Sequence, residues 1–264
     1  MKKIKLYIAL AAIAGFTSCD YLDIEPVGKV IASNTSEYRA LLTQGYLQYQ
    51  SISALGYLGL LADESSSIQT DYISGPLDKE SMPYTYTWRY NANMYEFGWE
   101  LYYKSLFYSN AIITEVMDAG VNGDESREQL LGEAYALRAY NHFELTNLYG
   151  KWYDPSTAAT DKTAPMSAST DIFQTFVPAT VAEMYDFILE DLRLAQQYME
   201  IERQDNSDIN YRFSLNAAKA LESRVRLYKQ DWQGAYDAAK PLIGEYTLFD
   251  LNTLPIVAWE DEVM

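Results

Sequence analysis

Cysteine and histidine are almost missing from this sequence, which has one of each in 264 residues. A single cysteine cannot close a disulfide within the chain or build a cysteine-rich zinc site. A single histidine argues against a histidine-based metal cluster or catalytic triad. Basic residues are also few, 20 against 37 acidic ones, and the net charge of −17 would repel phosphates. We therefore expect no cofactor, no metal, no nucleic-acid partner and no attraction to anionic membrane surfaces.

Hydrophobic residues, in contrast, are plentiful. They make up 48% of the chain and aromatic residues 14%, so the chain can bury a sizeable core and is not expected to be disordered. Tyrosine is the most unusual component, with 24 copies. A tyrosine ring has an apolar face and a polar tip, which suits binding surfaces that stay wet.

The N-terminus has the three parts of a signal peptide. A start rich in lysine is followed by an apolar run at residues 6–13, and small residues precede Cys19. The run is shorter than the roughly 20 residues that a membrane-spanning helix needs. Thr17 and Ser18, directly before the only cysteine, resemble a bacterial lipobox, although Phe16 stands where leucine is usual. The alternative is an ordinary secretory signal with a bystander cysteine.

The lipobox interpretation sets the expected domain organisation. Residues 1–18 are a lipoprotein signal peptide, and residues 19–264 form one α-helical domain that begins at a lipidated Cys19. Two or three acyl chains would anchor the chain stably, because each buried CH₂ contributes about 0.8 kcal/mol.

Helical periodicity dominates the rest of the sequence. Apolar and small residues recur at spacings of three and four in six stretches, which are 38–49, 99–117, 130–148, 181–192, 218–228 and 232–243. No persistent strand alternation is present, so the fold is predicted to be mostly α. Long irregular stretches rich in glycine, proline or serine interrupt the helices at 53–93 and 151–177. Loops of this length are often functional.

Several residues mark helix ends. Thr180 with Glu183, and Ser126 with Gln129, have the spacing of a capping box. Three glycines fall where helices should stop, namely Gly120, Gly150 and Gly244.

Two segments, 126–150 and 215–244, are similar to each other and to tetratricopeptide helix pairs. Each opens with small residues on one helix face, and Trp232 begins a second helix with alanines at turn spacing. Ser223 stands where such a repeat usually has glycine. We expect Trp232 to pack inside the repeat and Trp99, at the start of a helical stripe, to belong to the core.

Four segments in order resemble the SusD/RagB family of Bacteroidetes outer-membrane lipoproteins. They cover nearly the whole chain after the signal peptide. They are Cys19-Asp20-Tyr21-Leu22-Asp23-Ile24-Glu25-Pro26, Trp99 to Ile113, Gly132 to Gly150, and Val181 to Trp232.

The resemblance implies a SusD-like fold of tetratricopeptide-like helix pairs with long irregular loops. Family members are usually much longer, so this chain resembles their N-terminal half and is expected to be a fragment or a shortened product. The implied function is that of a cell-surface lipoprotein that binds nutrients, often oligosaccharides, and passes them to a TonB-dependent outer-membrane transporter (SusC-like) without catalysis. Early acids after Cys19 would mark export to the exterior; the alternative is a solvated linker.

Aromatic residues at 84–90 are the candidate ligand site. Tyr84, Tyr86, Trp88 and Tyr90 alternate, so an extended backbone would place all four on one face. Aromatic faces bind the C–H surfaces of sugars. The alternative is a strand or loop that packs into the core.

Other polar residues have structural interpretations. Asp63 and Glu64 could serve a hydrolase or a calcium site, but a solvated loop is the simpler assignment, and no carboxylate pair in a barrel context supports a hydrolase. We expect His142 to be a structural or surface residue, and Arg138 and Glu133 to form ion pairs inside the repeat. A second function remains open, in which the helical repeats are an interaction scaffold at the outer membrane that binds a protein and no glycan.

Overall fold

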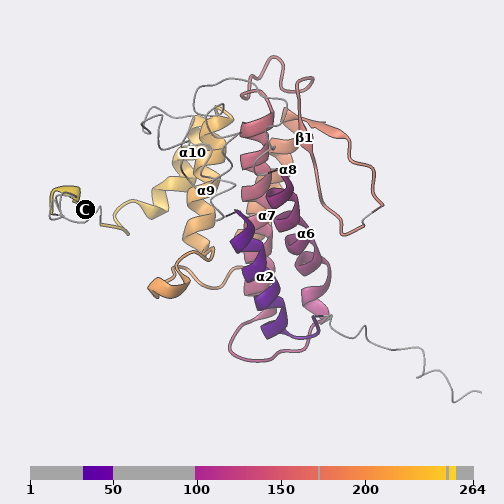
Figure 1. The fold of residues 1–264 in the computed structure, drawn as a ribbon. Coiled ribbons are helices and arrows are strands. Elements are labelled where there is room, and N and C mark those ends of the chain that lie inside the picture. The colour runs from indigo at the N-terminus through magenta and orange to yellow at the C-terminus, as the bar shows by residue number, and fades with distance from the viewer. Residues whose placement is uncertain (1–31, 50–98, 172, 248–249, 254–264) are drawn as a thin grey trace, which may run out of the picture. The chain divides into compact units, whose positions relative to one another are not determined.

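A computed structural model describes residues 32–49, 99–171, 173–247 and 250–253 (Figure 1). The chain divides into residues 1–33 and 34–264, and the account below concerns the second unit.

Six α-helices form the described part of this unit. They are α2 (Thr35–Tyr49), α6 (Trp99–Glu115), α7 (Arg127–Tyr149), α8 (Val181–Tyr198), α9 (Leu215–Tyr228) and α10 (Trp232–Ala239). Four single-turn 3₁₀ helices accompany them: η2 (Val116–Asp118), η3 (Ser207–Ile209), η4 (Lys240–Leu242) and η5 (Leu251–Thr253). The prediction of a mostly α fold is confirmed, and an α-helix occupies each of the six periodic stretches.

Side-chain caps define where two of these helices begin. At α8 both halves of the predicted capping box form: Thr180 Oγ1 accepts from the Glu183 amide, and a Glu183 carboxylate oxygen accepts from the Thr180 amide at 2.8 Å. At α7 only one half forms, because Ser126 accepts from the Gln129 amide but does not receive the Gln129 side chain in return. The Gln129 side-chain oxygen instead accepts from the Glu200 and Ile201 amides. The prediction of a full box at Ser126 is therefore wrong.

Helix α7 is the centre of the packing and contacts α2, α6, α8 and α9. Its largest apolar cluster joins Phe143 to Ile188 and neighbouring residues of α8 and to Val225 of α9. A second cluster consists of small side chains, Ala136, Ala195 and Ala218, from α7, α8 and α9. Small residues allow helices to approach closely. The predicted small-residue faces thus lie between helices, as expected for stacked helix pairs.

Gly132 shows how close this approach is. A Cβ atom added at Gly132 would lie 2.8 Å from the backbone nitrogen of Met199, where real Cβ atoms are essentially never found. The end of α8 therefore rests directly on the backbone of α7.

Two short strands accompany the helices of this mostly α fold. Strand β1 (Lys162–Pro165) lies within the stretch 151–177 predicted to be irregular, and it pairs antiparallel with β2 (Pro178–Thr180), which directly follows that stretch. With three and four residues, and with prolines at the paired ends, these strands are too short to leave an alternating pattern in the sequence.

The two tryptophans predicted to pack behave differently. Trp99 is partly buried and its ring lies 4.9 Å from Tyr103 and 4.8 Å from Tyr149, which confirms its role in packing. Trp232 is 64% exposed, so the prediction that it packs inside the repeat is wrong. Helix α10 has only eight residues and Ala235 is its only buried residue. Ser223, at the usual glycine position, bonds the Ala235 carbonyl at 2.8 Å and so joins α9 to α10.

Candidate functional site

The predicted ligand residues Tyr84, Tyr86, Trp88 and Tyr90 lie outside the described residues, as do Cys19, Asp63 and Glu64. The described chain resumes at Trp99, the first residue of α6.

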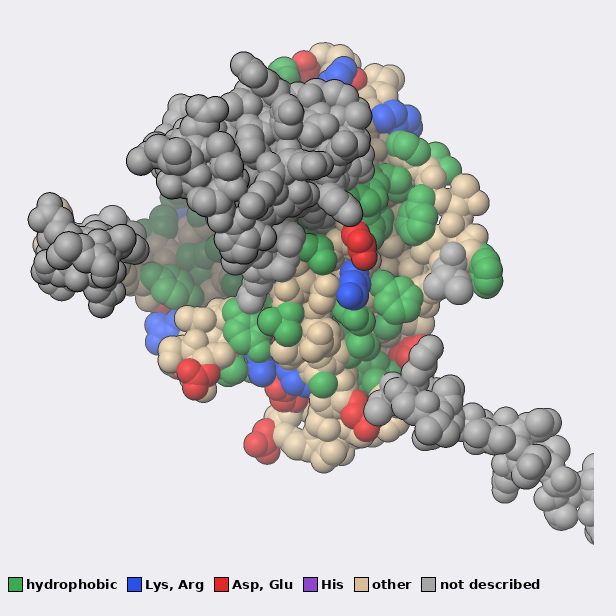
Figure 2. Space-filling model, viewed as in Figure 1, with side chains coloured by type: hydrophobic (Ala, Val, Ile, Leu, Met, Phe, Trp, Pro, Cys, Tyr) green, Lys and Arg blue, Asp and Glu red, His purple; other side chains and the backbone are tan. Residues whose placement is uncertain are grey.

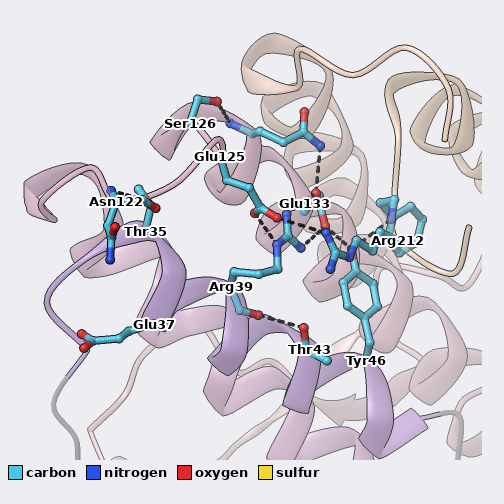
Figure 3. Close-up of polar contacts among 12 residues, drawn as sticks. Thr35, Glu37, Arg39, Thr43, Tyr46, Asn122, Glu125, Ser126, Glu133 and Arg212 are labelled. Atoms are coloured by element: carbon cyan, nitrogen blue, oxygen red, sulfur yellow. Dashed lines mark hydrogen bonds and ion pairs between the residues drawn. The ribbon is translucent and has the colours of Figure 1, made fainter. Parts of the chain in front are cut away.

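An ion-pair network connects α2 to α7 (Figure 3). The Arg39 guanidinium donates two hydrogen bonds of 2.8 Å to the fully buried Glu133 carboxylate. Its Nε also pairs with Glu125, which precedes α7. Burial alone would lower the pKa of Arg39, but the bonds that it donates to Glu133 and the charges of Glu133 and Glu125 raise this pKa above its usual value. The guanidinium therefore stays charged. The prediction that Glu133 forms an ion pair is confirmed, but its partner lies on α2 and not inside the repeat.

Tyr46 carries this network to the segment before α9. Its hydroxyl donates to Glu133 at 2.9 Å and accepts from the Phe213 amide at 3.0 Å. Burial, together with the charge of Glu133, raises the pKa of Tyr46 well above its usual value, so the hydroxyl keeps its proton. Arg212 donates to Glu125 at 3.0 Å, which fixes the same segment a second time (Figure 3).

A second buried network connects α6, α7 and α8. Arg138 of α7 pairs with Asp191 of α8 through two bonds and donates a third to Asn110 of α6 at 2.9 Å. The Asn110 amide donates in turn to the carbonyls of Ser167 and Ser169, each at 3.2 Å. The predicted ion pair of Arg138 is confirmed, and its partner lies on a different helix.

His142 belongs to the same region and is fully buried. Its Nε2 accepts from the Ser167 amide at 3.0 Å, which leaves the proton on Nδ1, 3.0 Å from the Arg138 carbonyl. Burial and the nearby Arg138 charge lower the pKa of His142 to about 3. The imidazole is therefore neutral and holds the loop after β1, as predicted for a structural histidine.

Within these two networks each buried charged side chain is paired with another side chain of the fold, so the pairs have a structural role. Within the described ranges, no group of three or more His, Cys, Asp or Glu side chains is placed to hold a metal ion. None of the described helices is both long and apolar enough to cross a membrane.

The chain is similar to known proteins in both sequence and structure. The sequence model of a SusD-like family, described as "Starch-binding associating with outer membrane", matches residues 20–227, most of the chain. The chain belongs to this SusD-like family. The resemblance drawn from the four sequence segments is thereby confirmed.

Individual relatives of this SusD-like chain are distant. A SusD-like protein P38 from Formosa agariphila is 25% identical over 155 residues, which are 59% of this chain and 27% of that protein. A SusD superfamily protein from Bacteroides vulgatus matches in structure with a TM-score of 0.67 and 23% identity, over 82% of this chain and 49% of that one. A laminarin-binding SusD-like protein matches with a TM-score of 0.63 and 22% identity, over 80% and 44%. The chain thus spans about half the length of these solved structures. The structural match shows that the chain shares their fold over that length.

Hydrophobic side chains gather on one face of the SusD-like unit, over α6 and the loop between β1 and β2 (Figure 2). Phe107 of α6 is 44% exposed and Phe173 of the loop 86%, while Phe176 packs edge-on against Tyr103 at 5.7 Å.

Three surface hollows are lined by described residues. Two of them share Gln196, Glu222 and Arg226, which bond to one another. The third lies at the start of α9, between Asn216 and Tyr246, and its polar groups are less completely paired. Sequence reasoning missed this third hollow, because its residues come from separate segments between Arg203 and Tyr246 and form no motif.

Proposed function

We propose that this chain is a cell-surface lipoprotein that binds oligosaccharides and delivers them to a TonB-dependent outer-membrane transporter. The observation that carries the proposal is the family match over residues 20–227, since the family is described as starch-binding and associated with the outer membrane. The laminarin-binding relative with the same fold supports a glycan as the ligand. In this proposal the chain binds its ligand without transforming it.

Tyr84, Tyr86, Trp88 and Tyr90 remain the proposed ligand platform. Aromatic rings in an irregular loop supply apolar faces for sugar rings, and tyrosine hydroxyls supply hydrogen bonds.

Binding measurements test the glycan proposal. The full chain with Cys19→Ala, titrated with maltoheptaose and laminarihexaose, should bind at least one of them. Trp88→Ala should abolish this binding, whereas Trp232→Ala, which removes a tryptophan that is 64% exposed on α10, should not. Hydrolysis of either oligosaccharide, or equal binding by wild type and Trp88→Ala, would contradict the proposal.

Membrane attachment is tested separately. We propose that Cys19 carries the lipid anchor and that residues 1–18 are removed. Fractionation of cells should find the wild-type chain with the outer membrane, accessible to added protease, and Cys19→Ala released from membranes. Unchanged membrane retention of Cys19→Ala would contradict the anchor.

A helical-repeat scaffold that holds no glycan is the second candidate. The observation that favours it is the row of exposed aromatic side chains at the end of α9 and along α10, where Tyr228, Trp232 and Tyr236 are each more than half exposed. Under this alternative, Trp232→Ala would reduce co-purification with an outer-membrane barrel protein, and the wild-type chain would bind no oligosaccharide.

A further inference from the structure

A hollow of about 360 Å³ opens at the first turn of α9, which is within the usual size range of ligand sites. Its lining includes the apolar side chains of Ala217, Ala220 and Leu242. Its rim carries amide and guanidinium groups, and Tyr246 stands at one edge with half of its surface exposed.

Asn216 is the residue that sets this hollow apart. It is only 7% exposed, yet its side-chain amide bonds to none of the described residues. Its backbone amide is satisfied by the Glu202 carbonyl at 3.1 Å. The amide is not among the buried polar atoms that lack a partner, so it reaches solvent in the hollow that Asn216 lines. The Asn216 side chain is therefore placed to bond to a molecule that enters the hollow.

Arg212 also lines the hollow and is fixed by an ion pair. Its Nη1 is held by Glu125 at 3.0 Å, which fixes the guanidinium, while its buried Nε has no partner in the described part of the chain. The two other hollows differ, because Arg226 there is bonded both to Glu222 and to Asp231. In the hollow beside α9, the Asn216 amide is the group left free to bond to a ligand among the described residues.

The charges around the hollow favour an uncharged ligand. Arg212 is paired with Glu125, and Arg203 with Asp205 at 2.7 Å, so each guanidinium is compensated by a carboxylate. The net charge of −17 adds no attraction for anions. A molecule rich in hydroxyl groups suits such a site, because each hydroxyl both donates and accepts.

We propose that this hollow is a binding subsite for one uncharged sugar unit of an oligosaccharide. A sugar hydroxyl oxygen accepts from Asn216 Nδ2, a hydroxyl hydrogen is donated to Asn216 Oδ1, and the ring lies against Tyr246. This inference rests on the proposed glycan function and adds a site separate from residues 84–90.

Calorimetric titration of the full chain with maltoheptaose, laminarihexaose and an oligogalacturonate tests it. Asn216→Ala and Tyr246→Ala should each weaken binding of the uncharged oligosaccharide about fivefold to tenfold, the effect of one lost hydrogen bond or stacked ring. Tyr236→Ala, with 53% exposure and no place in the hollow, is the matched control and should bind like wild type. Asn216→Ala should also leave Tm unchanged, because the amide has no protein partner to lose.

Each other outcome is decisive. If the wild-type chain binds an uncharged oligosaccharide and both variants bind it equally well, the subsite is wrong while the proposed function stands. If no glycan binds to the wild-type chain, both are wrong. Preferred binding of the oligogalacturonate would overturn the uncharged class. A large fall in Tm for Asn216→Ala, together with unchanged binding by Tyr246→Ala, would assign Asn216 to the fold instead.

Discussion

Arg138 on α7 and Asp191 on α8 form a two-pronged ion pair in the interior, with 2.8 Å between Nε and Oδ2 and 2.7 Å between Nη2 and Oδ1. Both residues are nearly inaccessible to solvent. An intact buried pair adds little to the free energy of unfolding. Removal of one partner lowers that free energy strongly, because the remaining buried charge has neither water nor a partner.

Arg138→Ala should therefore lower the free energy of unfolding by about 3–5 kcal/mol, the usual effect of removing one partner of a buried pair. The matched control is Arg193→Ala on α8, whose bond to Glu190 at 2.7 Å is similar in length but lies on the surface. That control should change stability by less than about 1 kcal/mol. Urea unfolding of the purified full chain measures both, and equal effects would contradict the interpretation.

The second prediction concerns pH. His142 has a pKa of about 3 in the folded chain against 6.5 in its unperturbed state, so the unfolded chain binds its proton first as the pH falls. The stability that this neutral histidine confers is complete above pH 6.5 and is lost progressively below it. The loss should reach about 2 kcal/mol at pH 5, where the pKa of the unfolded state lies 1.5 units higher.

His142 is the only histidine in the sequence, so the test is direct. Urea unfolding at several values between pH 5 and 7.5 should show a rising stability for wild type. His142→Gln, whose side-chain oxygen can still accept from the Ser167 amide, should lose most of that slope. The same slope in both proteins would show that other groups cause it.

The helices themselves could be predicted because their signals are local. The stripe from Val181 to Leu192 and the box of Thr180 with Glu183 lie within one or a few turns, and the structure reproduces both. The ion-pair partners could not be predicted, because Arg39 and Glu133 are 94 residues apart and only the packing of α2 on α7 joins them. The prediction that Trp232 is packed was wrong for a related reason. Periodicity assigns a residue to a helix face but does not say whether another element covers that face.

The candidate site was less accessible to sequence reasoning than the fold. Asn216 is an ordinary polar residue in the first turn of a helix, and nothing in its neighbours indicates that its side chain lines a hollow. The position of Arg212 could not be predicted either, because only the structure shows that Glu125 holds one end of its guanidinium. The hollow is a product of tertiary packing, whereas the aromatic site at 84–90 was proposed from spacing alone and remains a prediction.

The third prediction concerns the start of α8. Thr180→Ala removes the hydroxyl that accepts from the Glu183 amide and should lower the free energy of unfolding by about 1 kcal/mol. Thr180→Ser keeps a hydroxyl at the same position and should retain most of the stability. Thermal unfolding of the two variants checks this, and a Thr180→Ala variant as stable as wild type would show that the cap contributes nothing.

The fourth prediction concerns the hydroxyl of Tyr46, which joins three parts of the chain. It donates to Glu133 of α7 and accepts from the Phe213 amide, so Tyr46→Phe leaves a buried carboxylate with one donor fewer and a backbone amide without its partner. The free energy of unfolding should fall by about 1–3 kcal/mol. Hydrogen exchange at the Phe213 amide should also become faster, because that bond is lost directly. Tyr108→Phe on α6, where the tyrosine is only partly buried, is the control and should have little effect. Equal stability of Tyr46→Phe and wild type, with unchanged exchange at Phe213, would mean that the segment before α9 is held by Arg212 and Glu125 alone.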